Sequence, residues 1–161
     1  NQTLLLEQIF FWFQMNKFIK NCRIINLTKI IDSHDGVISI AEENKDVPFN
    51  IKRVYYIYGF ESEKSVRGYH AHKSLEQILF CISGSFCLRL DDGTNKHKLL
   101  MDDPNEGIFI GNNVWHTMEK FTNDCIIIVL ASDYYNESDY IRDYKEFKNY
   151  LTNNHFDDWT K

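Results

Sequence analysis

The feature that most constrains the fold of this 161-residue chain is a series of short segments rich in Ile, Val, Tyr and Phe. These residue types favour strands, and turn signals such as Asp35-Gly36 and Ser83-Gly84 separate the segments. Regular short strands of this kind predict a β-sandwich or barrel. The expected strands cover residues 23–27, 37–41, 52–58, 68–72, 77–82, 85–90, 97–101, 107–110, 114–119 and 125–131.

Helical spacing begins only near the C-terminus. From Ser138 onward, large side chains recur at helical intervals, which predicts a C-terminal helix that covers a sheet. The residues that carry this spacing are Ile141, Tyr144, Phe147 and Leu151. Many strands followed by one helix predict an all-β double-sheet jelly roll whose mouth holds one ligand. We expect residues 1–21 to be an N-terminal extension and residues 22–161 to form one domain.

The composition narrows the class of protein. A hydrophobic fraction of 43% and an aromatic fraction of 15% are typical of a globular domain. The net charge of −5 disfavours a general nucleic-acid binder, although a small anionic ligand fits wherever a few arginines gather. No two cysteines form a Cys-x-x-Cys pair, and most lie in apolar segments. We therefore expect free thiols and a reducing, cytoplasmic location.

The N-terminal segment is apolar but short. Residues 4–13 contain Glu7 and are shorter than the ~20 residues that a membrane-spanning helix needs. A signal peptide is a poor match, because the segment has no basic residue before it and no small-residue cleavage site after it. We expect no membrane span. Residues 1–14 are then an upstream extension, or an amphipathic helix that packs on the domain or on a second subunit.

Two histidines, His70 and His72, lie one residue apart in a segment expected to be extended. Side chains alternate between the faces of a strand, so the two imidazoles should point the same way. Glu76 and His116 follow in the ligand order of a metal-binding cupin, which would suit Fe, Mn, Ni or Zn. The spacing from the glutamate to the next glycine is one residue too long, and the second motif lacks its proline and glycine. Metal binding therefore stays one alternative of several.

Proton transfer without a metal needs fewer groups. A histidine acts as both base and acid near neutral pH, and arginine or amide donors stabilise a developing enediolate. Arg53 and Tyr55 share one face of residues 52–58, and Arg67 precedes the histidine pair. Two further alternatives are a structural histidine pair and a module that binds a ligand without turnover. For His116, a core residue and a ligand are equally good interpretations.

Four segments together resemble the dTDP-sugar 3,4-ketoisomerases: IKRVYYIY, RGYHAHKSLEQILFCISG, NNVWHTME and VLASDYYNESDYIRDY. The resemblance covers residues 24–151 and implies a cupin jelly roll without metal or cofactor. It implies a homodimer with exchanged N-terminal strands. The implied reaction converts dTDP-4-keto-6-deoxyglucose to a dTDP-3-keto-6-deoxyhexose, with the galacto product weakly favoured over gluco. The product would feed 3-amino-3,6-dideoxy sugars of surface glycans such as lipopolysaccharide.

The resemblance also implies residue roles. The family's histidine pair falls on His70 and His72, the expected base and proton shuttle. The implied substrate contacts are Arg53, Tyr55 and Arg67. From their positions in the chain we also expect Lys73, Tyr134 and Tyr135 to contact the substrate, and the alternative for the two tyrosines is that they pack the C-terminal helix down. One departure concerns the Asp-x-Arg-Gly segment common near the family's N-terminus. Here His34 lies near the place of that arginine, with one extra residue, so this loop is expected to influence which face of C4 is reprotonated.

Overall fold

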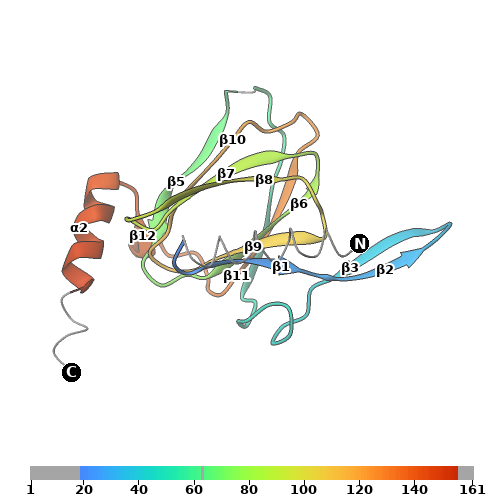
Figure 1. Ribbon diagram of the computed structural model, residues 1–161, viewed down its shortest axis with the longest axis horizontal. Coiled ribbons are helices and arrows are strands. Elements are labelled where there is room, and N and C mark those ends of the chain that lie inside the picture. The colour runs from blue at the N-terminus through green and yellow to red at the C-terminus, as the bar shows by residue number, and fades with distance from the viewer. Residues whose placement is uncertain (1–18, 63, 156–161) are drawn as a thin grey trace.

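The computed structural model describes residues 19–62 and 64–155, which form two five-stranded antiparallel sheets packed face to face (Figure 1). In spatial order, the first sheet contains β1 (Cys22–Asn26), β9 (Glu106–Ile110), β6 (Gln77–Ser83), β11 (Ile126–Ala131) and β4 (Arg53–Ile57). The second contains β12 (Tyr140–Ile141), β5 (Val66–His72), β10 (Trp115–Glu119), β7 (Phe86–Asp91) and β8 (Lys96–Met101). This is the expected cupin jelly roll.

The main core lies between the two sheets. Its members alternate along their strands, because every second side chain of a strand faces inward. Leu79, Ile108 and Ile127 of the first sheet meet Phe86 and Leu88 of the second, and all five are at most 1% exposed. Each such side chain contributes about 1.5–3 kcal/mol by leaving water. The packed sheets hold the inward-facing side chains near the open end of the sandwich in fixed positions.

Helix α2 (Tyr144–His155) closes one end of the second sheet (Figure 1). Phe147 of the helix is fully buried in a small cluster with Ala71, Trp115 and Ile141. The expected helical start at Ser138 was wrong. A 3-10 turn (Glu137–Asp139) and strand β12 come first, because the backbone of residues 140–141 pairs with β5 instead of continuing a helix.

All ten predicted strands are present, with bounds that differ by one or two residues at their ends. The sequence pattern did not predict β2 (Thr28–Asp32) or β12. Strand β12 has only two residues, so it exists through its pairing with Ala71 and His72 rather than through its own propensity. Strand β2 pairs with β3 (Gly36–Ile40) in a hairpin of two strands.

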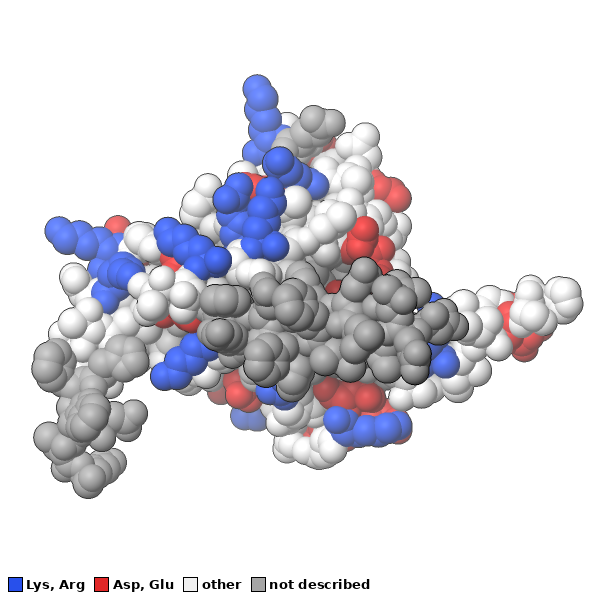
Figure 2. Space-filling view, viewed as in Figure 1, with Lys and Arg blue, Asp and Glu red and all other residues white. Residues whose placement is uncertain are grey.

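This hairpin, residues 28–40, projects away from the sandwich and is called the arm below (Figure 1). Ile30, Ile31, Val37 and Ile38 are 50%, 69%, 55% and 60% exposed. Figure 2 shows the arm as a mainly uncharged surface with acidic atoms near its outer end. A two-stranded ribbon with apolar side chains on both faces is only marginally stable by itself.

The packed region starts slightly before the first strand. Ile19 is 1% exposed and belongs to the main core, and the backbone N–H of Lys20 donates to Asp92 at 2.9 Å. The expectations for residues 1–14 lie outside the described residues. Within the described part of the chain, no helix has the length and apolar character needed to cross a membrane.

Candidate active site

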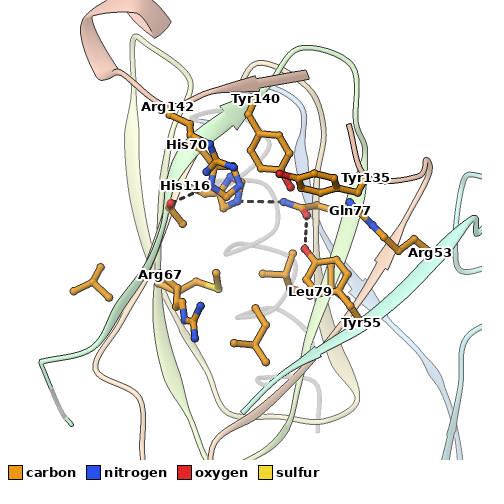
Figure 3. Close-up of a pocket in the computed structure, with 15 residues that line it drawn as sticks. Arg53, Tyr55, Arg67, His70, Gln77, Leu79, His116, Tyr135, Tyr140 and Arg142 are labelled. Atoms are coloured by element: carbon orange, nitrogen blue, oxygen red, sulfur yellow. Dashed lines mark hydrogen bonds between the residues drawn. The ribbon is translucent and has the colours of Figure 1, made fainter. Parts of the chain in front are cut away.

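A cavity of about 520 Å³ opens between the two sheets near the histidine pair (Figure 3). Strand β4 lines one side of it and strand β5 the other, and the segment after β11 forms part of its rim. Its polar lining residues are Arg53, Tyr55, Arg67, His70, Gln77, His116, Tyr135, Tyr140 and Arg142.

A β-bulge in β5 aims His70 into the cavity. His116 of β10 pairs with His70, but the next residue, Thr117, pairs with Gly68, so Tyr69 is the extra residue. Gly68 and Tyr69 have φ angles of 87° and 54°, a conformation that L-residues seldom adopt. A Cβ atom on Gly68 would lie 2.6 Å from the carbonyl oxygen of His116. The bulge therefore needs glycine at this position.

The bulge also fixes the tautomer of His70. Nδ1 of His70 lies 3.0 Å from the carbonyl oxygen of Gly68, which only accepts hydrogen bonds. The proton therefore sits on Nδ1, and Nε2 keeps its lone pair. Burial lowers the pKa of His70 to about 4, so the imidazole is neutral near pH 7. Among the described residues no group donates a hydrogen bond to Nε2 of His70, so this neutral imidazole at the cavity wall is equipped to act as a base.

His72 lies behind His70, with ring centroids 4.9 Å apart, and is 3% exposed. Its Nδ1–H donates to Oδ2 of Asp139 at 2.9 Å. The Asp139 carboxylate also accepts hydrogen bonds from the N–H and hydroxyl of Ser74 and from the N–H of Leu75, at 2.8, 2.6 and 3.3 Å. Burial lowers the pKa of His72, and the bond to Asp139 opposes that shift. The pair resembles the histidine–carboxylate part of a catalytic triad.

His116 forms part of a second hydrogen-bonded group. It is 2% exposed, and burial lowers its pKa well below the ordinary value. Its Nδ1 lies 3.3 Å from the Val114 carbonyl, and its Nε2 lies 3.2 Å from Nε2 of Gln77. Tyr55 donates its hydroxyl proton to Oε1 of Gln77 at 3.3 Å. Figure 3 shows Gln77 between His116 and Tyr55.

The four-ligand metal site considered from the sequence is not formed. Nitrogen atoms of His70, His72 and His116 lie within 4.8 Å of one another, so the three histidines are close enough to bind one metal ion. Glu76, however, lines a separate depression, because neighbouring residues of an extended segment face opposite ways and Gln77 faces the cavity. The lone pair on Nε2 of His116 already accepts a hydrogen bond from Gln77.

Three arginines give the cavity mouth a positive character. Within the described part of the chain, Nε of Arg53 is buried without a hydrogen-bond partner, while its guanidinium lies 5.2 Å from the ring centre of Tyr55. The guanidinium of Arg142 lies 4.2 Å from the ring centre of Tyr140 and pairs with Glu137 at 2.7 Å. Arg67 contributes from β5. Guanidinium groups beside aromatic rings suit an anionic ligand such as a phosphate ester.

The structure brings most of the predicted contacts together, but not all of them. Arg53, Tyr55, Arg67, His70 and Tyr135 line the cavity, and His72 contacts it through His70. Three predicted residues lie elsewhere, and their positions need a separate account.

Lys73 donates its ammonium proton to the Ser138 carbonyl at 2.8 Å, away from the cavity lining. Tyr134 is 70% exposed and lies beside Lys52 rather than in the cavity. His34 lies in the turn between β2 and β3, at the tip of the arm, and is not among the residues that line the cavity. The structure therefore does not place the predicted Lys73 and Tyr134 contacts within the cavity.

The sequence interpretation missed Gln77, Asp139, Tyr140 and Arg142. The sequence interpretation considered Glu76 as a metal ligand and passed over its neighbour Gln77, because strand alternation alone could not decide which of the two faces inward. Asp139 lies 67 residues after its partner His72, and no local pattern links the two. The segment that contains Tyr140 and Arg142 was assigned to the C-terminal helix, so its approach to β5 was not expected.

The chain is similar to known proteins over most of its length. Residues 20–152 match the family model FdtA, described as WxcM-like, C-terminal. A curated relative from Aneurinibacillus thermoaerophilus, named TDP-4-oxo-6-deoxy-alpha-D-glucose-3,4-oxoisomerase, is 51% identical over 129 residues, covering 80% of this chain and 91% of the relative.

Two solved structures are similar over nearly the whole domain. The WlaRB TDP-quinovose 3,4-ketoisomerase from Campylobacter jejuni is 46% identical with a TM-score of 0.77, covering 81% of this chain and 99% of its own. A variant of the 3,4-ketoisomerase QdtA from Thermoanaerobacterium thermosaccharolyticum, in complex with TDP-4-keto-6-deoxyglucose, is 39% identical with a TM-score of 0.78. It covers 82% of this chain and 94% of its own.

Proposed function

Since this chain belongs to the FdtA family of sugar 3,4-ketoisomerases, we propose that it converts dTDP-4-keto-6-deoxyglucose into the corresponding dTDP-3-keto-6-deoxyhexose. The observation that carries the proposal is His70, a neutral imidazole with a free Nε2 at the wall of a cavity ringed by arginines. The name of the 51% identical relative and the keto sugar bound to QdtA support the same reaction.

The proposed chemistry moves two protons and needs no external oxidant. Nε2 of His70 removes the proton from C3, and the electron pair of the broken C–H bond forms the C3–C4 double bond of an enediolate. His70 then returns a proton to C4, while the C3 hydroxyl proton passes to the former C4 carbonyl oxygen. The C3 oxygen becomes the new ketone. Proton transfer by a positioned histidine contributes ~10²- to 10⁴-fold to such reactions.

The residues around His70 divide the remaining tasks. His72 and Asp139 hold and relay protons behind the base, because the Nδ1–H of His72 is fixed by the carboxylate. Arg53, Arg67 and Arg142 bind the diphosphate and offset the charge of the enediolate. Tyr55 and Tyr135 contact the sugar or the base of the nucleotide. Lys73 and Tyr134 would reach the ligand only through a movement of the rim.

Proton NMR in deuterated water tests this function directly. Incubation with dTDP-4-keto-6-deoxyglucose should give a 3-keto product that carries deuterium at C4, and 4-keto sugar re-formed by the reverse reaction should carry deuterium at C3. Binding of the dTDP sugar without any incorporation would identify a binding module instead of an enzyme. Stoichiometric metal in the purified protein, with activity lost on chelation, would contradict a mechanism that uses imidazoles alone.

The same spectra decide the configuration at C4. The galacto product stays a prediction. The solved relative WlaRB is named instead for TDP-quinovose, whose sugar has the gluco configuration. A ketone at C3 is the group that an aminotransferase converts to an amine. We therefore place the reaction ahead of an amination, on the route to a 3-amino-3,6-dideoxy sugar of surface glycans such as lipopolysaccharide. A cytoplasmic location also stays a prediction.

We further propose a homodimer in which the arms are exchanged. The arm exposes apolar side chains on both faces, a costly arrangement for an isolated chain. Strand β4 is an edge strand of its sheet and exposes Val54 and Tyr56, with Tyr58 just beyond its end. An unpaired edge beside apolar side chains is a template for another strand. The arm of a second copy would pair with the open edge of β4, and this contact would bury the apolar side chains of both the arm and β4.

Charged substitutions in the arm should dissociate this dimer. Ile31→Glu together with Ile38→Glu places a carboxylate on each face of the arm. Burial of one isoleucine is worth about 1.5–3 kcal/mol, so we expect dimerisation to weaken by at least ~100-fold. Analytical ultracentrifugation across a concentration series measures the change. Leu100→Glu, at a 59% exposed position on β8, is the control that should leave association intact. Equal association of all three proteins would rule out the arm as the interface.

A further inference from the structure

Three imidazoles crowd one end of the cavity, and each has its Nδ1 near a group that only accepts hydrogen bonds. The ring centroids of His70 and His116 are 4.5 Å apart, and those of His70 and His72 are 4.9 Å apart. The acceptors are the carbonyls of Gly68 and Val114 and the carboxylate of Asp139. Every Nε2 therefore carries a lone pair. Proximity alone does not decide which of the three takes a proton from a ligand.

The hydrogen bonds through Gln77 can run in only one direction. The Val114 carbonyl requires the proton of His116 on Nδ1, so Nε2 of the neutral ring is an acceptor. Its partner must then be the amide N–H of Gln77. This orientation turns Oε1 of Gln77 toward Tyr55, whose hydroxyl must donate. Each group in the series from Tyr55 to Val114 has one possible role.

This direction has two consequences for the cavity. The lone pair on Nε2 of His116 is occupied by Gln77 and is not available to a ligand. The proton of Tyr55 is also committed, so its oxygen can only accept a hydrogen bond from a ligand hydroxyl. His72 is 3% exposed and does not line the cavity. Among the described histidines, His70 is the one that lines the cavity with an Nε2 free of a hydrogen bond.

We propose that Gln77 is a positioning residue. It occupies the Nε2 lone pair of His116, which keeps His116 out of proton transfer, and it engages the proton of Tyr55, so that Tyr55 can only accept a hydrogen bond from the ligand. His70 then acts as the one base. Gln77 is 2% exposed and contacts both groups with its two amide atoms. A glutamine suits this task because it donates on one side, accepts on the other and does not titrate. The kinetic part of the inference rests on the proposed function, whereas the hydrogen-bond part does not.

Two variants of similar size separate the donor from the acceptor. Gln77→Glu keeps an acceptor for Tyr55 but at neutral pH offers no N–H to His116. Gln77→Met keeps the volume and removes both hydrogen bonds. In wild type, nitrogen-15 NMR of the ligand-free protein should show His116 protonated on Nδ1 alone at pH 7. The ionisable groups that face His116 are His70 and His72 of β5, with Tyr55 of β4 behind Gln77.

In Gln77→Glu, we expect His116 and the new carboxylate to share one additional proton at pH 7. The affinity of His116 for protons should rise at least tenfold, and the signal of its Nε2 should move toward that of a protonated nitrogen. In Gln77→Met, the proton should stay on Nδ1, while the Nε2 signal loses the effect of the amide. Unchanged His116 signals in both folded variants would overturn the proposal, because they would show that Gln77 does not contact the ring in solution.

Kinetics supply the second readout. Gln77→Met should lower kcat about tenfold with little change in KM, since two neutral hydrogen bonds are lost. Tyr55→Phe should lower kcat by a similar factor and also raise KM, because it removes the acceptor for a ligand hydroxyl. The double variant should be scarcely worse than Tyr55→Phe alone, because the bond between Tyr55 and Gln77 is lost in both single variants. Additive effects, or a lower melting temperature with normal kcat and pH profile, would reduce Gln77 to a structural residue. Expected NMR signals in a wild-type protein without isomerase activity would contradict the proposed function alone.

Discussion

Replacing His70 with asparagine should lower kcat by ~10²- to 10⁴-fold, the range that a lost general base costs. Asparagine is close in size to imidazole and can still accept the hydrogen bonds of a bound sugar, but it cannot take a proton. Because the base acts only in the chemical step, the Kd for dTDP should stay within about threefold of wild type. Turnover is followed by NMR, and binding by calorimetry with dTDP.

The control for this variant is His97→Asn. His97 lies on β8 and lines a different depression of the surface, so its replacement should leave kcat unchanged. Loss of dTDP binding in parallel with turnover would make His70 a ligand contact instead of the base. Full activity of His70→Asn would remove the mechanism altogether. We also expect a severe but smaller defect for His72→Asn, because His72 is reached only through His70.

The depressed pKa of His70 predicts the shape of the pH profile of the same reaction. Burial lowers this pKa to about 4, so His70 is unprotonated and active at neutral pH. The rate constant kcat/KM should be flat from pH 8 down to about 5 and fall below that as His70 gains its proton. An ordinary histidine, with a pKa near 6.5, would lose activity already below pH 7. The acid limb should be absent in the residual activity of His70→Asn.

The sequence predicted those parts of the site that depend on local geometry. His70 and His72 point the same way because strand side chains alternate, and Arg53 and Tyr55 share a face for the same reason. The same rule failed at Glu76 and Gln77, where the two neighbours offer similar hydrogen-bonding atoms. The strand begins at Gln77, and its first residue faces inward. A shift of one residue exchanges the two faces, and no sequence pattern determines this register.

The parts that depend on tertiary contacts were beyond local reasoning. The turn that contains Asp139 and the two-residue strand that follows it read as helix, because Ile141, Tyr144 and Phe147 keep helical spacing. In the structure, β12 pairs with Ala71 and His72, and this pairing carries Asp139 to the imidazole of His72. The helix begins only at Tyr144, where Asp143 accepts the N–H of Glu146 and caps it. The pairing of one short strand therefore outweighed the helical spacing of these residues.

Asp139→Asn tests whether that pairing matters for chemistry. The amide keeps the size of the carboxylate but removes its charge and one of its two acceptor oxygens, so the four donors that now meet Asp139 can no longer all be satisfied. We expect kcat to fall on the order of 10²-fold. This is less than the ~10⁴-fold cost of amidating the carboxylate of a catalytic triad, because His72 acts behind the base and not as the base.

The pH profile distinguishes a role in proton transfer from simple destabilisation. Asp139 raises the proton affinity of His72 against the effect of burial, so its amidation should lower the pKa of His72 further. If kcat changes as His72 gains or loses a proton, the pH at which this change occurs should therefore be lower in the variant. Asp133→Asn is the matched control, since it removes a 61% exposed carboxylate from the same stretch of chain and should change neither kcat nor the profile. If Asp139→Asn lowered only the melting temperature, the carboxylate would be a structural anchor for the segment after β11. A different result would show that Asp139 acts on the reaction through the imidazole it holds. In that case kcat falls, dTDP binding stays normal, and the pH at which kcat changes with the protonation of His72 moves down.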